Sequence, residues 1–153
     1  MQEGVLSEHS KLLDSACVIL YHKQSTSAMT RFFRLEDGPV VMGAPLPKLS
    51  RVVTDEVELD SAVVLHPASV AAEMERWFGV ESGALEVDSD YQELIEVPGG
   101  TLRVYLARFK TVDPPFAAAE KAGGSFITLT QTRGMNPVEL ELLRTAYTSI
   151  MEG

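Results

Sequence analysis

The sequence predicts an α/β fold, of the α+β kind, in which helices flank a mixed β-sheet to form a single layered sandwich. Three observations favour this class: the chain has 153 residues, 45% of them are hydrophobic, and short apolar runs alternate with amphipathic segments. No linker, internal repeat or low-complexity segment divides the chain, so we expect one globular domain over residues 1–153.

The clearest helix is predicted near the C-terminal end of the sequence. Asn136 suits the cap, Pro137 suits the first turn, and Glu139 completes a capping-box arrangement. Apolar residues then recur at helical spacing as far as Met151, which predicts a helix with one buried face. That face comprises Leu140, Leu143, Tyr147 and Ile150, with Leu142 and Ala146 alongside.

Two further helices are predicted inside the chain. The first runs from about residue 67 to residue 78, because Pro67 suits a first turn and Gly79 suits a left-handed end. Its buried stripe comprises Val70, Met74, Trp77 and Phe78. A shorter helix over 116–122 follows a pair of prolines and ends at a pair of glycines.

Strands occupy the remaining apolar segments. They are expected at residues 16–21, 30–35, 40–43, 62–65, 91–97, 102–109 and 126–129. The strongest pairing signal is a hairpin in which Pro98, Gly99 and Gly100 connect 91–97 with 102–109.

The net charge of −9 is concentrated in the middle of the chain. Between Asp55 and Glu96 there are twelve acidic residues and one basic residue, Arg76, so this segment carries a charge of −11. Such a negative field repels phosphate backbones, and we expect no nucleic-acid partner. The acidic segment favours cations or a basic protein; alternatively, it is a solvated surface that keeps the protein soluble.

The composition also bears on location and on metal binding. The apolar runs are too short to cross a bilayer, and the first residues lack the pattern of a signal peptide, so we expect a cytoplasmic protein without a membrane partner. The single cysteine, Cys17, lies in an apolar strand and is expected to be a buried, inert thiol. The three histidines are not spaced as metal ligands, and we predict no metal site.

Residues 72–80, Ala-Glu-Met-Glu-Arg-Trp-Phe-Gly-Val, resemble the second half of the Nudix hydrolase signature. In that signature an arginine and a glutamate precede two adjacent metal-binding glutamates, which a glycine and an apolar residue follow. The matching positions are Glu73, Met74, Gly79 and Val80. The departures are Ala72 for the leading arginine, Arg76 and Trp77 for the glutamate pair, Glu58 for the first glycine and Val64 for the first glutamate.

The resemblance implies a Nudix-like fold over about residues 15–151, with a mixed sheet between helices. It also implies a hydrolase chemistry in which carboxylates hold Mg²⁺ or Mn²⁺ beside a diphosphate and the metal activates water. With the glutamate pair replaced, the nearest catalytic candidates are Glu73, Glu75 and Glu81. Glu73 and Glu75 lie two residues apart, so they point to different faces of a helix and cannot chelate one ion together.

Four arginines on predicted strands are the candidate ligand-binding residues. They are Arg31, Arg34, Arg103 and Arg108. If their strands are neighbours, two or more guanidinium groups on one open face can receive a small anionic ligand or an acidic partner. Salt bridges to the acidic segment are the alternative interpretation.

Three classes of function remain open. We favour a non-catalytic binding or assembly module without a cofactor, because no catalytic motif is complete. Trp77, Phe78 and Phe116 are then the candidate contacts with a protein partner or within a homodimer. The first alternative is a pyrophosphohydrolase of the nucleoside-diphosphate type that uses Mg²⁺ or Mn²⁺ and the displaced glutamates. The second is a regulatory domain that binds a nucleotide or a small anion without hydrolysing it.

Overall fold

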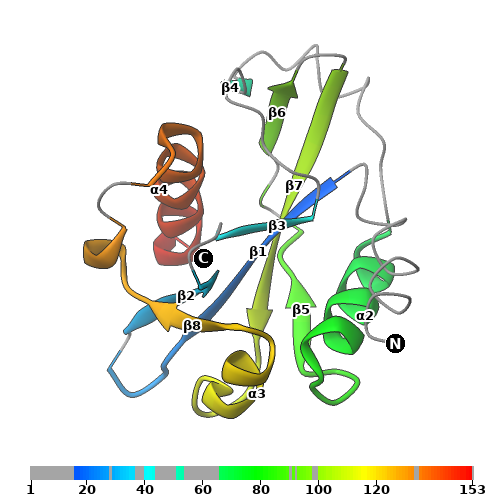
Figure 1. The fold of residues 1–153 in the computed structure, drawn as a ribbon, viewed down its shortest axis with the longest axis vertical. Coiled ribbons are helices and arrows are strands. Elements are labelled where there is room, and N and C mark those ends of the chain that lie inside the picture. Colours follow the sequence, from blue (N-terminus) through cyan, green and yellow to red (C-terminus); the bar gives the residue numbers. More distant parts are fainter. Residues whose placement is uncertain are drawn as a thin grey trace.

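In the computed structural model, helices cover both faces of one mixed β-sheet (Figure 1). The structure describes residues 16–27, 29–36, 40–43, 51–53, 66–89, 91, 93–97, 100–132 and 135–152. The predicted fold class is confirmed, because the described part of the chain forms an eight-stranded sheet between helices.

The strands follow one another as β1 (Ala16–Lys23), β2 (Thr30–Leu35), β3 (Val41–Gly43), β4 (Arg51–Val53), β5 (Leu85–Val87), β6 (Glu93–Val97), β7 (Gly100–Phe109) and β8 (Gly124–Ile127). The helices are α2 (Pro67–Phe78), α3 (Phe116–Lys121) and α4 (Pro137–Glu152), with a short 3₁₀ helix, η2 (Leu129–Gln131). In the sheet the order is β4-β6-β7-β1-β2-β8, with β3 paired to β1 and β5 paired to β7. Only β1 and β7 run parallel; the other described pairs are antiparallel.

The centre of the sheet is the parallel pair of β1 and β7. The first seven residues of β1 are all buried, as expected for a strand whose two faces are both covered. Along its outer edge, β1 pairs with β3 through its first half and with β2 through its second half. The outer edge of β7 pairs with β6 through its first half and with β5 near its end. The register sets Tyr21 opposite Arg108 of β7 and opposite Phe32 of β2.

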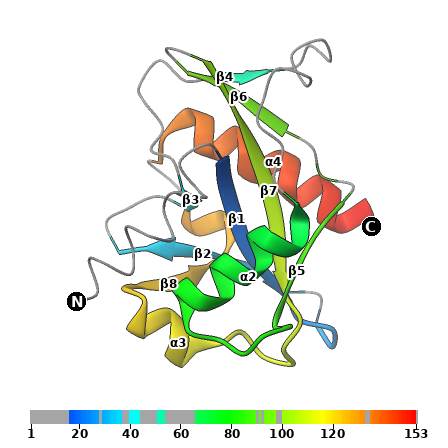
Figure 2. The same ribbon diagram turned by 90° about the vertical axis from the view of Figure 1, so that its right-hand side faces the viewer.

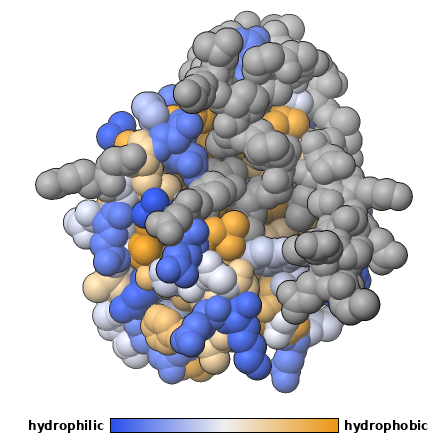
Figure 3. All heavy atoms as spheres, in the orientation of Figure 1, coloured by the Kyte–Doolittle hydropathy of each residue, from blue (hydrophilic) through white to orange (hydrophobic). Residues whose placement is uncertain are grey.

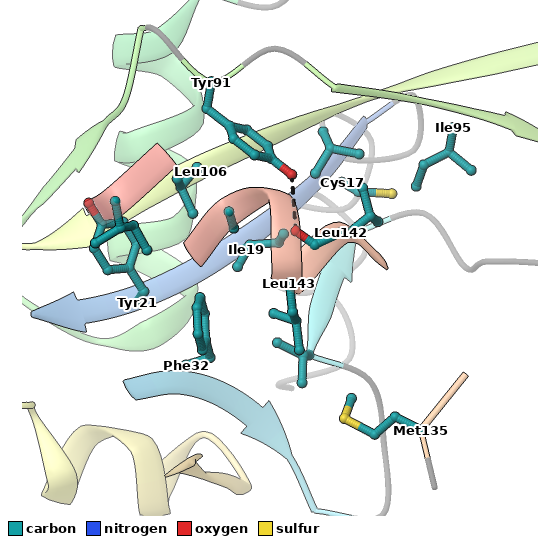
Figure 4. Close-up of a cluster of buried hydrophobic side chains, with 14 of the residues drawn as sticks. Cys17, Ile19, Tyr21, Phe32, Tyr91, Ile95, Leu106, Met135, Leu142 and Leu143 are labelled. Carbon is teal, nitrogen blue, oxygen red and sulfur yellow. Dashed lines mark hydrogen bonds between the residues drawn. The ribbon is translucent and has the colours of Figure 1, made fainter. Parts of the chain in front are cut away.

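Two hydrophobic cores lie on the two faces of this pair. In Figure 1, α4 stands on one side of β1 and β7, and α2 stands on the other. The α4 core includes Cys17, Ile19, Phe32, Leu106, Leu142 and Leu143, several of which are drawn in Figure 4. The core under α2 and α3 includes Val18, Leu20, Phe33, Met74, Phe78 and Phe109. Residues of β1 and β7 enter the two cores alternately, which is the period-two pattern of a strand.

The bounds of α2 and β2 agree with the sequence predictions, and the predicted hairpin is present as β6 and β7. At the end of α2, Gly79 has φ +81°, which confirms the left-handed end. His66 caps the start of the helix, because its Nδ1 accepts from the Ala68 amide at 3.1 Å. The predicted strand at 62–65 lies outside the described residues.

Several predicted bounds were wrong. The strand predicted at 126–129 begins at Gly124 and ends at Ile127, because the second glycine after α3 belongs to the sheet. A β-carbon on Gly124 would lie 2.2 Å from the Arg34 carbonyl oxygen, so only glycine allows β8 to approach β2 this closely. β1 extends beyond the predicted end at Tyr21 as far as Lys23, whereas β3 and β6 begin one and two residues later than predicted. β4 and β5 were not predicted, because three residues contain too little alternation to be recognised.

The start of α4 has a helix cap and a hydrogen bond to a residue that is distant in the sequence. The Asn136 side-chain oxygen accepts from the Val138 amide at 2.8 Å, which confirms the predicted cap. The Glu139 carboxylate accepts at 2.8 Å from the amide of Val40, far away in the sequence, and is buried. The buried face of α4 is centred on Leu142, Leu143 and Ala146. Tyr147, which was predicted to lie on this face, is 37% exposed, so the predicted face was rotated around the helix relative to the observed one.

Candidate functional site

The glutamates of the Nudix-like segment serve the fold of α2. Glu75 is 7% exposed, and its Oε2 accepts from the amides of Gly83 at 2.9 Å and of Leu85 at 3.0 Å. These bonds tie the loop after α2 to the start of β5. Glu73 forms an ion pair with Arg76 one turn later on the same helix, and Glu81 is exposed beyond the helix end.

Glu73 and Glu75 therefore bind different partners, and Glu81 joins neither of them. Among the residues that the structure describes, no group of three His, Cys, Asp or Glu side chains is placed to hold a metal ion. Trp77 packs its ring edge-on against Phe33 at a centroid distance of 6.2 Å. Through Trp77, residues 72–80 thus contribute to the core under α2 and α3.

The four nominated arginines lie on β2 and β7, but alternate residues of a strand face opposite sides. Arg31 and Arg103 lie on the face covered by α2 and α3; Arg34 and Arg108 lie on the face covered by α4. Arg31 donates to the Gln24 side chain at 3.3 Å, and its guanidinium lies over the Phe116 ring, 6.0 Å from the centroid. The four side chains do not form one cationic surface.

The three aromatic interface candidates also separate. Phe78 is a core residue, because its ring packs at 4.8 Å from Phe33 and at 4.9 Å from Phe109. Trp77 is half-buried beside it, whereas Phe116 is 55% exposed. Around α3, in the lower part of Figure 3, hydrophobic areas are small and alternate with hydrophilic side chains. Of the three, Phe116 therefore offers the most surface to a partner.

A pocket of about 440 Å³ opens beside the C-terminal ends of the parallel strands. Its lining comes from β1, from β5 and the turn after it, from β7, and from the last turns of α4, whose end is marked C in Figure 2. The lining residues are Tyr21, Lys23, Glu86, Val87, Asp88, Ser89, Arg108, Ser149 and Ile150. Arg108 is the one residue of this lining that the sequence had nominated.

The pairing of the strands explains why these side chains meet. Tyr21 of β1 lies opposite Arg108 of β7, and Arg108 lies opposite Glu86 of β5, so the three form a row across the sheet. Lys23 is two residues beyond Tyr21 and Asp88 is two residues beyond Glu86, so both share the face of this row. α4 covers the same face, and its last turns close one side of the pocket.

The pocket lining carries equal numbers of cations and carboxylates. The Arg108 guanidinium forms an ion pair with Glu86 at 3.2 Å, and both side chains are well exposed. Within the described part of the chain, Lys23 forms no ion pair. The lining thus has two cations on β1 and β7, and two carboxylates on β5 and the turn that follows it.

Tyr21 forms the inner wall of the pocket. Burial, reinforced by the negative charge of Asp88, raises the pKa of Tyr21 to about 12, so its hydroxyl is protonated at neutral pH. Among the described residues, no hydrogen bond satisfies this hydroxyl. The pocket therefore holds a neutral phenol that is free to donate to a ligand.

Sequence reasoning missed Tyr21, Lys23, Glu86, Asp88 and Ser149 as pocket residues. One signal was present, because Tyr21 and Lys23 lie two residues apart on one strand and must share a strand face. The parallel pairing of β1 with β7 carries no such signal, and it is this pairing that sets Arg108 beside Tyr21.

The chain matches no model of a known protein family, and its sequence matches none of the curated proteins with which it was compared. No helix in the described ranges is both long enough and apolar enough to cross a membrane. The geometry of the pocket is therefore the main support for any statement about function.

Proposed function

We propose that this protein is a non-catalytic binding domain whose pocket between β1, β5, β7 and α4 receives a small polar ligand. The observation that carries the proposal is the row of Tyr21, Arg108 and Glu86, which presents a phenol, a cation and a carboxylate to one opening. A concave site with a few converging polar groups on rigid strands is typical of small-molecule binding. The volume of about 440 Å³ suits a ligand of metabolite size.

The same geometry supports binding without catalysis. Glu75 is engaged by two backbone amides and Glu73 by Arg76, so the carboxylates of the Nudix-like segment are committed to the fold. A hydrolase of the nucleoside-diphosphate type needs carboxylates that converge on Mg²⁺ or Mn²⁺. The domain we propose needs neither metal, and its role is to report or retain a ligand, as in a regulatory domain.

A thermal-shift screen tests this proposal. The purified protein is heated with nucleotides, dinucleotides, sugar phosphates, amino acids and dipeptides, each with and without Mg²⁺ or Mn²⁺. A true ligand at about a hundredfold excess over its Kd stabilises the folded state by about 2.7 kcal/mol. We expect a metal-independent shift that Arg108→Gln weakens and that the control Arg31→Gln, outside the pocket, preserves.

Two outcomes would contradict the proposal. A ligand whose effect survives Arg108→Gln binds elsewhere on the protein. A metal-dependent shift with product release, abolished by Glu73→Gln but preserved in Glu81→Gln, supports the hydrolase alternative instead.

A second candidate function, assembly with a protein partner or a second copy, is favoured by one observation. Phe116 is 55% exposed and carries the Arg31 guanidinium over its ring, and aromatic and arginine side chains are enriched in protein interfaces. Sedimentation velocity at high concentration tests it. Self-association that Phe116→Ser abolishes supports assembly, whereas a monomer at all concentrations argues against a homodimer.

A further inference from the structure

We propose that the pocket takes a neutral, hydroxyl-rich ligand of the sugar class, in which two adjacent hydroxyl groups bind the Arg108–Glu86 ion pair and a third binds the Tyr21 hydroxyl. This inference rests on the proposed binding function and adds the chemical class of the ligand. It follows from three features: the two signs of charge are intermixed in the lining, the ion pair is exposed, and no hydrogen bond within the described residues engages the Tyr21 hydroxyl.

Charges of both signs act on the same part of the pocket. Burial has the largest effect on the pKa of Tyr21; the negative charges of Asp88 and Glu86 raise this pKa further, whereas the positive charge of Arg108 lowers it. Asp88 is already engaged within the protein, so it adds a negative charge beside Tyr21 rather than a free contact for a ligand. A carboxylate or phosphate near Tyr21 would meet two carboxylates, and an ammonium would meet Arg108 and Lys23. Because contacts between like charges lower affinity, this lining favours a neutral ligand.

The ion pair places a hydrogen-bond donor beside an acceptor at the surface of the pocket. A guanidinium nitrogen of Arg108 lies 3.2 Å from a Glu86 carboxylate oxygen, and the two side chains are 45% and 60% exposed. A guanidinium has five N–H donors and a carboxylate has about four acceptor positions, so both groups keep capacity for a ligand. Adjacent hydroxyl oxygens of a sugar have nearly the spacing of this pair. One hydroxyl can accept from Arg108 while its neighbour donates to Glu86, and the two charges stay neutralised.

The strand register adds a third contact in line with the ion pair. Tyr21 lies opposite Arg108, and Arg108 lies opposite Glu86, so hydrogen-bonding groups follow one another across the sheet at a strand spacing of about 4.8 Å. The Tyr21 hydroxyl is protonated at neutral pH and can both donate and accept, as a sugar hydroxyl can. Ser149 of α4 adds another hydroxyl to the lining. A ring with hydroxyl groups on successive carbons suits this array better than a group that only donates or only accepts.

NMR titration of the ¹⁵N-labelled protein with matched sugars tests the class of ligand. The neutral probes are glucose, galactose and mannose. Each is compared with its uronate, which adds a carboxylate, and with its 2-amino sugar, which adds an ammonium. We expect at least one neutral sugar to shift the pocket amides saturably, and both of its charged analogues to bind about tenfold more weakly. High salt should change the affinity of the neutral sugar little, because the ligand carries no charge to be screened.

Deoxy sugars test the contact with the ion pair. The 2-deoxy, 3-deoxy and 4-deoxy forms of the sugar that binds each lack one hydroxyl group and stay neutral. Removal of a hydroxyl that contacts the guanidinium or the carboxylate eliminates a hydrogen bond to a charged group, so at least one deoxy form should bind about tenfold more weakly than its parent.

Variants of the ion pair should change which charge the pocket prefers. Glu86→Gln leaves Arg108 without its partner and should shift the preference toward the uronate. Arg108→Gln leaves Glu86 unpaired and should shift the preference toward the amino sugar. Tyr21→Phe should weaken binding of the neutral sugar about fivefold without creating a preference for either charge. Lys110→Gln and Glu81→Gln change exposed charges outside the lining and should leave binding unchanged.

The circular dichroism spectrum and melting temperature of each variant verify folding, and the sugar series tests the unmodified protein independently of any variant. Failure of this inference is distinguishable from failure of the proposed function. A charged compound that binds the pocket at least as tightly as every neutral sugar overturns the neutral ligand and leaves the binding domain standing. Deoxy sugars that all bind as tightly as their parent overturn the contact with the ion pair. Absence of pocket shifts with every sugar and with the whole polar screen overturns both the inference and the proposed function.

Discussion

At the scale of single residues, a buried carboxylate decides the path of the chain after α2. Glu75 accepts hydrogen bonds from two backbone amides, those of Gly83 and Leu85, and these donors lie where the loop turns into β5. A hydrogen bond to a charged group contributes more than a neutral one, and the buried Leu85 amide would be left without a partner if the carboxylate were removed. Glu75, which the sequence nominated for catalysis, therefore stabilises the fold.

We predict that Glu75→Ala lowers the free energy of unfolding by about 2 kcal/mol, because it removes two hydrogen bonds to a buried carboxylate. Urea unfolding followed by circular dichroism measures the change. Glu81→Ala is the matched control, since it removes an exposed glutamate from the adjacent loop and should change stability by less than about 0.5 kcal/mol. Equal stability of the two variants would show that the contacts of Glu75 contribute little.

At the scale of elements, two glycines are required for different physical reasons. Gly79 ends α2 with φ +81°, and a β-carbon there would meet no atom within 4 Å. Gly124 has ordinary backbone angles, but a β-carbon there would collide with the Arg34 carbonyl and with the Phe33 ring at 2.7 Å. The first position needs glycine for its conformation and the second for the close approach of β8 to β2.

The two substitutions to alanine should therefore differ in cost. Gly79→Ala forces a left-handed conformation on alanine and should destabilise the protein by about 1 kcal/mol. Gly124→Ala must push β8 away from β2 or shift Phe33 in the core, and should destabilise it by about 3 kcal/mol. Thermal and urea unfolding of both variants measure the difference, and the reverse ranking would contradict the packing of β8.

The elements that the sequence predicts well are those whose own residues mark where they start or end. Pro67 and Gly79 bound α2, and Asn136 with Pro137 starts α4, so local chemistry determines these ends. β4 and β5 have three residues each, and what makes them strands is pairing with β6 and β7. Such pairing is decided by tertiary contacts, which is why neither strand could be predicted from its own residues.

At the scale of the whole molecule, stability should fall at alkaline pH. Burial raises the pKa of Tyr21 to about 12 and raises the pKa of Tyr91 as well, against an ordinary value near 10. Above pH 10 the unfolded chain ionises these phenols while the folded protein keeps them neutral. Their contribution to stability is therefore complete below pH 10 and is lost as the pH rises toward 12.

We predict that Tyr91→Phe makes this alkaline loss shallower. The Tyr91 hydroxyl donates to the Leu142 carbonyl at 3.4 Å inside the α4 core (Figure 4) and shares a hydrogen bond with the Thr145 hydroxyl at 3.0 Å. The variant should therefore also lose about 1 kcal/mol at neutral pH. Urea unfolding at intervals between pH 7 and pH 11.5 gives both quantities. A slope identical to that of the unsubstituted protein above pH 10 would mean that Tyr91 does not control the alkaline transition.

The candidate site was less predictable than the fold, and the reason is topological. Arg108 was nominated from the sequence, but its partners Tyr21 and Glu86 belong to strands that neither precede nor follow β7 directly. The spacing of Arg31 and Arg34 already places them on opposite faces of one strand, and the same holds for Arg103 and Arg108. Parity of spacing could thus have rejected a single arginine surface, whereas the pocket required the register of three strands.

The parallel pair at the centre of the sheet has a consequence for how the protein is made. β1 is the first described strand to leave the ribosome. Its parallel neighbour β7 is synthesised only after β2 to β6 and α2. At the usual rate of 5–20 residues per second, the delay is on the order of ten seconds. During that time β1 can pair only with β2 and β3, and the edge that later pairs with β7 has no hydrogen-bonding partner strand. The nascent chain therefore carries an apolar, half-paired strand, which is where a chaperone would give the most protection against aggregation.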